Sequence, residues 1–447
     1  MTNEKYGLIG KTLVHSYSKE IHEALGRYQY QLFSLAEDEM PDFINARDFR
    51  GLNVTIPYKK DVIPLCDEVT DLARGIGAVN TLFWKNASGA GASESISQED
   101  KILVGHNTDY EGVLYAASRA GIAFEGKGVL ILGTGGTSLM ARRAAADQNA
   151  AKIYIASRHP ETDPPSGSEI QDAGILSTVS YDQLPEIADS IDVIVNTTPV
   201  GTFPNNMQQV IRLKDFPGCQ AVIDVIYNPF KTALLLEAEK LGLKYTNGLP
   251  MLVAQATAAA GYFLGTPRAF QKENQRIIKS MKQQMGNIVL IGMPGTGKSL
   301  IGKFLAELTG KTLQDTDAKI EEEAKMTIPE IFEKEGETGF RDRESAICKK
   351  LGKERNLIIA TGGGAILRPE NVDALRQNGT LVHITRSIDK LPTRGRPLSK
   401  NIETLKKMEA QRMPLYKAAA DITFRNNYTC SRKKLRQRVN TYILEKL

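Results

Sequence analysis

The 447-residue sequence is poor in cysteine and tryptophan, with four cysteines and a single tryptophan. The cysteines lie far apart, and none forms a CxxC pair or stands at metal-ligand spacing from a histidine: Cys66, Cys219, Cys348 and Cys430. This pattern excludes a disulfide framework and a zinc module, and it favours a reducing compartment. We therefore predict a cytoplasmic protein.

The sequence also lacks long apolar runs and a strong excess of charge. No uncharged apolar run approaches the roughly 18 residues of a membrane span, and the N-terminus has no basic segment followed by an apolar one. The 57 basic and 52 acidic side chains leave a net charge of +5, which is small for this length. We expect neither a membrane nor a nucleic acid as partner, so phosphate recognition must come from local sites.

One basic segment needs a separate explanation. Residues 425–447 carry seven Lys or Arg and one Glu. Leu435, Val439, Tyr442 and Ile443 recur at helical spacing within it. This spacing predicts a packed terminal helix with a solvated basic face rather than a nucleic-acid patch.

The length exceeds what one hydrophobic core usually supports, so two or three domains are expected. Strand-length apolar runs, such as those at 128–132, 152–156, 192–195, 221–225 and 287–291, alternate with helix-length amphipathic segments. This alternation predicts an α/β fold with parallel sheets. The Gln- and Lys-rich segment 269–286 is the predicted linker between residues 1–268 and 287–447. Residues 86–100 have turn composition and predict a long hairpin loop.

The strongest motif lies in the second half. Residues 292–299 satisfy GxxxxGK[ST] after an apolar strand-like run and before a helical pattern. Such a loop directs backbone N–H groups at phosphates, its lysine reaches the β- and γ-phosphates, and its serine hydroxyl can bind Mg²⁺. We predict ATP binding by Gly295, Thr296, Gly297, Lys298, Ser299 and Leu300.

Further polar motifs follow the P-loop in a fixed order: Asp315-Thr316-Asp317, Gly336 to Glu344 (GETGFRDRE), Thr361 to Gly364 (TGGG), Arg396-Pro397-Leu398 and Arg412 to Tyr416 (RMPLY). With the P-loop, this series resembles shikimate kinase over residues 287–447. The resemblance implies a P-loop domain like that of the nucleoside monophosphate kinases, which phosphorylates the 3-hydroxyl of shikimate with ATP and Mg²⁺.

The resemblance also assigns roles to residues of this half. Asp317 is the expected base and ligand of the ring hydroxyls, and the substrate site is completed by Arg341, Gly363, Gly364 and Arg412. The two arginines suit a carboxylate because the guanidinium group binds it through charge-assisted hydrogen bonds. Ser299 and Asp315 are the expected Mg²⁺ ligands. Lys298 of the P-loop and Arg396, which is expected on a lid, would neutralise charge in the transition state. Arg394 is the candidate contact of adenine.

A second glycine-rich loop lies in the first half. Gly133, Gly135, Gly136 and Thr137 follow the apolar run 129–132 and precede a helical pattern, in a variant of the dinucleotide-binding fingerprint. The next strand ends in Ser157-Arg158 without the acidic residue that would bind a free 2'-hydroxyl. Arg158 therefore favours NADP over NAD.

Other motifs surround this loop in order: His15 to Ser18 (HSYS), Gly51 to Lys59 (GLNVTIPYK), Gly77 to Thr81 (GAVNT), Asn107 to Asp109 (NTD), Asn196 to Gly201 (NTTPVG), Tyr227 to Pro229 (YNP) and Gly248 to Gln255 (GLPMLVAQ). This series resembles shikimate dehydrogenase over nearly all of residues 6–265. The resemblance implies a substrate domain at about 1–108 and 242–268 and a Rossmann-like NADP domain at about 109–241. It implies the reversible NADP-dependent reduction of 3-dehydroshikimate to shikimate.

Within that resemblance, Lys59 and Asp109 form the expected acid/base pair, because hydride addition to a ketone generates alkoxide character that a nearby proton donor stabilises. Ser16 and Ser18 would point the same way in an extended segment and hold the substrate carboxylate, together with Tyr227. The resemblance makes Thr55, Asn80 and Gln255 ligands of the ring hydroxyls. It adds Thr197 and Gly248 to the NADP site.

The two halves together predict a bifunctional enzyme of aromatic biosynthesis, which reduces 3-dehydroshikimate and then phosphorylates the product. Two alternatives remain open. One half could bind nucleotide as a regulatory module without turnover, or the P-loop half could be an ATPase switch. A regulatory module would leave only one of the two activities, and an ATPase switch would hydrolyse ATP without shikimate.

Overall fold

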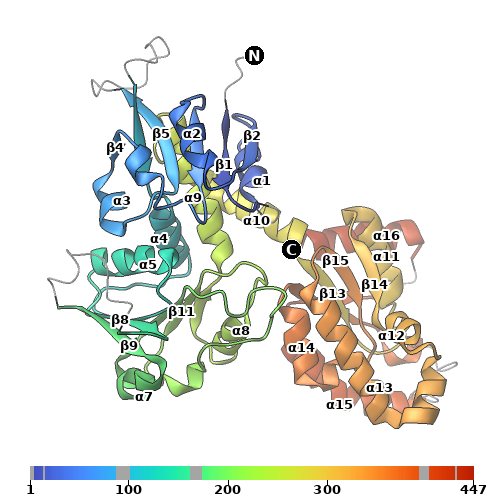
Figure 1. Ribbon diagram of the computed structural model, residues 1–447. Coiled ribbons are helices and arrows are strands. Elements are labelled where there is room, and N and C mark those ends of the chain that lie inside the picture. The colour runs from blue at the N-terminus through green and yellow to red at the C-terminus, as the bar shows by residue number, and fades with distance from the viewer. Residues whose placement is uncertain (1–4, 14–15, 87–100, 162–173, 392–401, 428–429) are drawn as a thin grey trace. The chain divides into compact units, whose positions relative to one another are not determined.

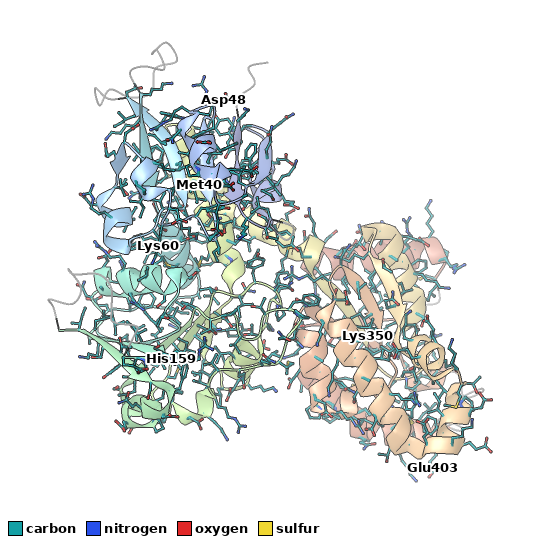
Figure 2. All side chains as sticks on the ribbon, viewed as in Figure 1. Met40, Asp48, Lys60, His159, Lys350 and Glu403 are labelled. Atoms are coloured by element: carbon teal, nitrogen blue, oxygen red, sulfur yellow. The ribbon has the colours of Figure 1, made fainter. Side chains whose placement is uncertain are left out.

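The computed structural model describes residues 5–13, 16–86, 101–161, 174–391, 402–427 and 430–447 (Figure 1). The chain divides into two compact units. The first contains residues 1–200, 209–227 and 237–279, and the second contains residues 201–208, 228–236 and 280–447. Apolar side chains such as Met40 are buried, whereas Asp48, Lys60 and Lys350 are exposed (Figure 2).

The first unit begins with a six-stranded sheet in the order β2-β1-β3-β5-β6-β4. The strands are β1 (Tyr6–Gly10), β2 (Tyr30–Ser34), β3 (Gly51–Val54), β4 (Glu68–Val69), β5 (Thr81–Asn86) and β6 (Lys101–His106). The helices near it in sequence are α1 (Ser18–Glu23), α2 (Glu39–Asn45) and α3 (Asp71–Ile76). Strand β5 pairs antiparallel with β3 and β6, and its pairing with β6 is the one that the predicted hairpin requires. A hairpin returns its second strand antiparallel, and the predicted loop, now residues 87–100, lies outside the described residues.

A second, wholly parallel sheet of the first unit has the order β12-β11-β10-β7-β8-β9. Its strands are β7 (Gly128–Leu132), β8 (Lys152–Ser157), β9 (Leu176–Ser180), β10 (Val193–Asn196), β11 (Ala221–Asp224) and β12 (Lys244–Thr246). The accompanying helices are α4 (Asp109–Arg119), α5 (Gly136–Asp147), α7 (Leu184–Ile187) and α8 (Ala233–Lys240). Helix α9 (Gly248–Phe263) then packs along α4 and contributes Ala259 and Phe263 to the core beside β1.

The second unit is built on a parallel five-stranded sheet in the order β14-β15-β13-β16-β17. Its strands are β13 (Asn287–Ile291), β14 (Thr312–Asp315), β15 (Leu357–Ala360), β16 (Gly379–Thr385) and β17 (Ile422–Arg425). Successive residues of β13 point to opposite faces, so Ile288 and Leu290 enter one apolar core and Val289 and Ile291 the other. A strand buried on both faces explains why this run contains almost no polar residue.

Helices surround this sheet in the order α11 (Lys298–Thr309), α12 (Thr316–Ala324), α13 (Ile328–Lys353), α14 (Pro369–Arg376), α15 (Ile402–Ala419) and α16 (Arg432–Ile443). Helix α13 is kinked at Gly336, where φ is 68°. The terminal helix confirms the prediction for residues 425–447, because Leu435, Val439 and Ile443 are buried. Tyr442 is an exception, since it is 49% exposed.

The segment predicted as a linker contains a helix, α10 (Asn274–Met285). Its overall composition is polar, but Ile277, Ile278, Met281 and Met285 recur every three or four residues and are buried. An average over the segment hides this apolar stripe, so composition did not indicate the helix, while the division between the two units at 279/280 falls within the segment. The domain limits at 268 and 287 remain predictions.

No described helix is long and apolar enough to cross a membrane. All four cysteines are free thiols. Within the described ranges, no three His, Cys, Asp or Glu side chains gather at a potential metal site.

Candidate active sites

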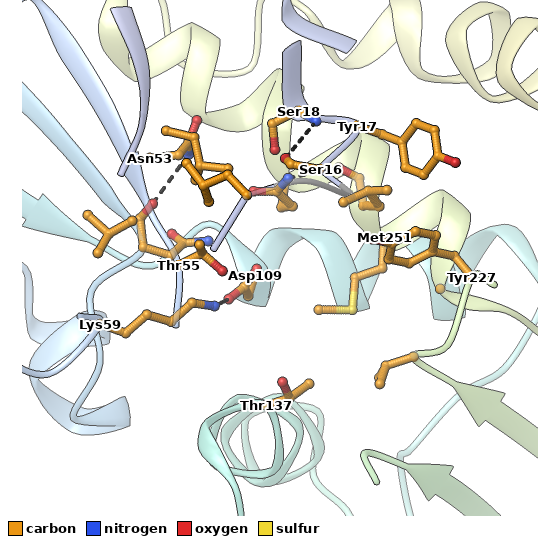
Figure 3. Close-up of a pocket in the computed structure, with 18 of the residues that line it drawn as sticks. Ser16, Tyr17, Ser18, Asn53, Thr55, Lys59, Asp109, Thr137, Tyr227 and Met251 are labelled. Atoms are coloured by element: carbon orange, nitrogen blue, oxygen red, sulfur yellow. Dashed lines mark hydrogen bonds and ion pairs between the residues drawn. The ribbon is translucent and has the colours of Figure 1, made fainter. Parts of the chain in front are cut away.

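The first unit contains a cavity of about 400 Å³. Its lining includes all eight residues that the sequence predicts for the dehydrogenase substrate, from both sheets of the unit (Figure 3): Ser16, Ser18, Thr55, Lys59, Asn80, Asp109, Tyr227 and Gln255. Tyr17, Asn53, Met251 and Leu252 also line the cavity and were not predicted.

An ion pair lies at the wall of this cavity. Lys59 Nζ donates to Asp109 Oδ2 at 2.6 Å, and their side chains are 25% and 16% exposed (Figure 3). Asp109 is the first residue of α4, where its backbone N–H donates to Asn107 Oδ1. A partly buried lysine held by a carboxylate can donate a proton to an oxygen that gains negative charge.

The serines do not lie in an extended segment, as the sequence argument supposed. Ser18 begins α1, Tyr17 precedes it with φ −95° and ψ 7°, and Ser18 N donates to Ser16 Oγ at 3.3 Å. The turn still brings both serines to the cavity wall (Figure 3). Local hydrogen bonding by serine at a helix start explains the turn.

The side-chain amides of Asn80 and Gln255 already make some of their hydrogen bonds within the protein. Asn80 Oδ1 accepts from Thr108 N at 2.7 Å and from Thr81 Oγ1 at 2.9 Å, so its amide N–H groups are the ones suited to a substrate hydroxyl. Gln255 Nε2 donates to Leu252 O at 2.9 Å, which leaves Oε1 as an acceptor. Thr55 follows β3, Asn80 precedes β5 and Gln255 lies on α9, so these three residues reach the cavity from different elements.

The predicted cofactor residues lie at or after the carboxyl ends of β7, β8 and β10, except Gly248, which follows β12 and begins α9. Gly133 has φ +100°, and a Cβ there would be 3.2 Å from Thr197 Oγ1. No atom lies within 4 Å of a Cβ built on Gly135 or Gly136, where α5 begins, so these residues fit a pyrophosphate at the helix N-terminus. Thr137, the residue after Gly136 on α5, lines the cavity.

The end of β8 carries the predicted 2'-phosphate site. Ser157 is buried and accepts a hydrogen bond from His159 N, whereas Arg158 is exposed. Burial raises the pKa of Tyr181, and the charge of Arg158 partly opposes that shift, so the two side chains are near each other. No sequence pattern singles out Tyr181.

Gly248 is required by a close backbone approach at the start of α9. A Cβ at this position would lie 1.9 Å from Val225 O. We expect Gly248→Ala to lower the free energy of unfolding by about 1–3 kcal/mol, because backbone must move. Gly136→Ala, at the start of α5 and in open space, is the matched control and should leave stability unchanged or slightly increased. Thermal unfolding of both variants measures this, and equal stabilities would contradict it.

The second unit contains a cavity of about 590 Å³. Its lining includes the P-loop, the ends of β14 and β15, and part of α13 and α15. The predicted residues that line it are Gly295, Gly297, Lys298, Ser299, Leu300, Asp315, Asp317, Arg341, Gly363, Gly364 and Arg412. Thr296, also a P-loop residue, is buried and does not line the cavity; its hydroxyl donates to Met293 O. Arg394 and Arg396 lie outside the described residues.

The P-loop has the conformation that its glycines allow. Gly295 and Gly297 have φ of +84° and +96°. Lys298 Nζ donates to Gly292 O at 2.8 Å and Met293 O at 3.1 Å, which folds the loop around its ammonium group. Asn426 was missed by sequence reasoning, yet its side chain donates to Thr296 O at 2.7 Å and supports the loop from the end of β17.

Ser299 and Asp315 meet as predicted for a magnesium site. Ser299 Oγ donates to Asp315 Oδ2 at 2.9 Å. A hydroxyl and a carboxylate oxygen are the hard ligands that Mg²⁺ prefers, and phosphate oxygens and water usually complete its shell. The pair therefore fits Mg²⁺ delivered with a nucleotide.

The lining of this cavity also includes the two arginines. Arg341 donates to Glu344 at 2.7 Å and to Glu337 at 3.1 Å, and Arg412 donates to Gly363 O at 3.0 Å. Glu344 and Tyr416 are functional candidates that sequence reasoning missed: Glu344 is fully buried, and Tyr416 donates to Gly363 O at 2.6 Å. Glu344 belongs to the motif that contains Arg341, three residues earlier on α13, and this helical spacing could have identified it.

Asp317 lines the same cavity. Burial raises its pKa to about 6, with further contributions from the neighbouring carboxylates of Asp315 and Glu344. Asp317 Oδ1 and Glu344 Oε1 are buried and have no hydrogen-bond partner among the described residues, and both lie near Gly362. Buried acceptors without donors fit a ligand that supplies hydroxyl groups.

The raised pKa of Asp317 predicts the pH dependence of the kinase reaction. Protonation removes its ability to accept a proton, so kcat/KM for shikimate should fall as the pH drops below about 6, approaching tenfold per pH unit. Initial rates between pH 5 and 8 measure this, with enzyme preincubated at each pH and assayed at pH 7.5 to control for inactivation. A constant kcat/KM down to pH 5 would contradict it.

Comparison with known proteins identifies both parts of the chain. The family model "Shikimate dehydrogenase substrate binding domain" matches residues 8–82, and the model "Shikimate kinase" matches residues 294–447. A shikimate dehydrogenase (NADP(+)) of Caldicellulosiruptor bescii is 35% identical over 57% of this chain and 88% of its own. The shikimate dehydrogenase (NADP(+)) of Caldicellulosiruptor saccharolyticus is 32% identical over 63% of this chain and 100% of its own.

Solved structures of shikimate dehydrogenases are also similar to this chain. A chorismate mutase/shikimate 5-dehydrogenase fusion protein from Clostridium acetobutylicum is 31% identical with a TM-score of 0.54, and covers 63% of this chain and 98% of its own. Shikimate 5-dehydrogenase from Thermus thermophilus, solved with NADP(H) and shikimate, is 27% identical with a TM-score of 0.51, over 62% of this chain and 99% of its own. The chain therefore belongs to the shikimate dehydrogenase family and carries a shikimate kinase domain in the same polypeptide.

Proposed function

We propose that the chain catalyses two consecutive reactions: the reversible NADP-dependent reduction of 3-dehydroshikimate to shikimate, and the ATP-dependent phosphorylation of shikimate to shikimate 3-phosphate. The observation that carries the proposal is the presence in one chain of two separate cavities, one lined by the Lys59–Asp109 pair and one lined by a P-loop and two arginines. We assign the first reaction to residues 1–268 and the second to residues 287–447.

In the first reaction, NADPH supplies a hydride to the carbonyl carbon of the substrate. Lys59 donates a proton to the carbonyl oxygen as its negative charge develops, and Asp109 holds the ammonium group in place. Ser16, Ser18 and Tyr227 bind the carboxylate through hydroxyl groups. Thr55, Asn80 and Gln255 hold the ring hydroxyls and so fix the orientation of the ring.

The assignment of NADP as cofactor rests on the open space around Gly135 and Gly136 and on the positive charge of Arg158. Gly133, Gly135, Gly136 and Thr137 accommodate the pyrophosphate, with Thr197 and Gly248 beside them. Arg158, exposed after Ser157, is the cation for the 2'-phosphate. The relatives named as NADP(+) enzymes support the same choice.

In the second reaction, the 3-hydroxyl of shikimate attacks the γ-phosphorus of ATP, the bond from that phosphorus to the β,γ-bridging oxygen breaks, and ADP leaves. Asp317 orients the hydroxyl and accepts its proton, while Arg341 and Arg412 hold the carboxylate in the same cavity. Lys298 neutralises charge on the phosphate oxygens, and Ser299 and Asp315 provide ligands for Mg²⁺. Gly363 and Gly364 bring backbone close to the ring, and we include Arg396 as the lid cation.

A coupled assay tests the whole proposal. Purified protein is mixed with 3-dehydroshikimate, NADPH, Mg²⁺ and ATP, while NADPH oxidation and shikimate 3-phosphate are followed. The phosphate should appear only when both NADPH and ATP are present. Shikimate that accumulates despite ATP would contradict the kinase assignment and indicate a regulatory nucleotide-binding module; ATP hydrolysis without shikimate would indicate an ATPase switch.

A further inference from the structure

Tyr17 occupies a position that the proposed chemistry does not explain. It lies between Ser16 and Ser18, the two hydroxyl residues assigned to the substrate carboxylate, and its side chain lines the same cavity (Figure 3). It immediately precedes α1 and makes no capping hydrogen bond there through its side chain. A helix cap therefore does not account for a tyrosine at this position.

The ring of Tyr17 meets the ring of Tyr227. Their centroids are 6.0 Å apart and their planes are inclined at 82°, which is an edge-to-face contact. Both side chains are partly exposed and both line the cavity. Edge-to-face pairs are attractive because the positive edge of one ring faces the negative face of the other.

The two tyrosines come from different parts of the first unit. Tyr17 lies in the turn between β1 and α1, beside the mixed sheet. Tyr227 follows β11 of the parallel sheet, beyond Asp224. The contact therefore joins the turn that carries the two serines to the segment that carries the third hydroxyl assigned to the carboxylate.

We propose that Tyr17 is a positioning residue of the dehydrogenase site. The ring of Tyr17 holds the Tyr227 side chain so that the Tyr227 hydroxyl faces the substrate carboxylate, opposite Ser16 and Ser18. The contact restricts rotation of the Tyr227 side chain before substrate arrives, so less conformational freedom is lost on binding. The Tyr17–Tyr227 contact should affect binding of the substrate carboxylate and not binding of the cofactor. The role rests on the proposed dehydrogenase function, since it concerns the substrate of that reaction.

The test compares Tyr17→Ala, Tyr17→Phe, Tyr227→Ala and the double variant Tyr17→Ala/Tyr227→Ala. Loss of the contact should raise the KM for shikimate about 2- to 12-fold, the range expected for an edge-to-face pair, with no proportional change in the KM for NADP⁺. Phenylalanine retains the ring and should restore the wild-type KM within about twofold. In the Tyr227→Ala background, Tyr17→Ala should have no further effect on KM, because its partner is already absent.

Lys19→Ala is the matched control for disturbance of the turn, because Lys19 is an exposed neighbour on α1 that does not line the cavity. Its KM for shikimate should equal that of the wild type. An unchanged KM in Tyr17→Ala, an equal increase in the Tyr227→Ala background, or failure of phenylalanine to rescue would each overturn the proposal. Absence of turnover in the wild-type chain would instead reject the dehydrogenase function, so the two failures are distinguishable.

Discussion

Lys59→Ala should slow the turnover of 3-dehydroshikimate by about 10²- to 10⁴-fold, the contribution typical of a positioned general acid. The variant removes the ammonium group that lies 2.6 Å from Asp109 and leaves that carboxylate without its cation. The oxygen of the reduced carbonyl then gains its proton from water. Oxidation of NADPH at saturating substrate measures the loss, and shikimate phosphorylation by the same preparation should remain at the wild-type rate.

Lys60→Ala is the matched control for this variant. Lys60 follows Lys59 in the chain, but it is exposed and does not line the cavity (Figure 2). It should therefore keep wild-type dehydrogenase activity. A Lys59→Ala protein with more than about a tenth of the wild-type turnover would remove Lys59 from the role of proton donor. Loss of both activities would show instead that the two halves do not work independently.

Lys298→Ala should have a comparable effect on the second reaction, with the turnover of shikimate phosphorylation reduced by about 10²- to 10³-fold or more. Two causes act together. The variant removes the cation expected to contact the phosphates, and it removes the donor that binds Gly292 O and Met293 O within the P-loop. Formation of shikimate 3-phosphate measures the loss, while NADPH oxidation by the same protein should not change.

Lys303→Ala provides the control for Lys298. Lys303 is an exposed lysine of the same helix, α11, and does not line the ATP cavity. Its kinase activity should equal that of the wild type. Because Lys298 also shapes the loop, thermal unfolding of both variants should be measured, so that a catalytic loss is separated from unfolding. Wild-type phosphorylation by a folded Lys298→Ala protein would refute the assigned role.

The sequence was sufficient wherever neighbouring residues define the structure. The GxxxxGK[ST] run predicted a phosphate loop because glycine spacing and the following helix are local properties, and the loop has the expected positive φ values. The apolar runs at β7, β10 and β13 were recognisable because strands buried on both faces contain little else. Composition did not indicate helix α10, because its stripe of four apolar residues is hidden in a polar average.

Several features of the two sites depend on residues distant in sequence. Glu344 could be paired with Arg341 from helical spacing, but its burial and its proximity to Asp317, on another helix, exist only in the folded chain. Asn426 supports the P-loop from a position more than a hundred residues later in the chain. The raised pKa of Asp317 arises mainly from burial, which no local pattern encodes, and further from the carboxylate of Asp315 two residues earlier and from that of Glu344 on another helix.

The sequence by itself determined the identity of the chain: two nucleotide-binding loops, their order, and the residue types for hydride transfer and phosphoryl transfer. The two loops follow from short-range spacing, because a loop that binds phosphate is made by consecutive backbone groups, whereas the residues for the two reactions were assigned through the resemblance to the two families. Only the tertiary structure decided the distances and protonation equilibria, such as the Lys59–Asp109 contact and the Tyr17–Tyr227 contact, and the antiparallel placement of β5. The physical reason is that electrostatic and packing energies depend on separation in space and on exclusion of water, which the folded chain alone establishes.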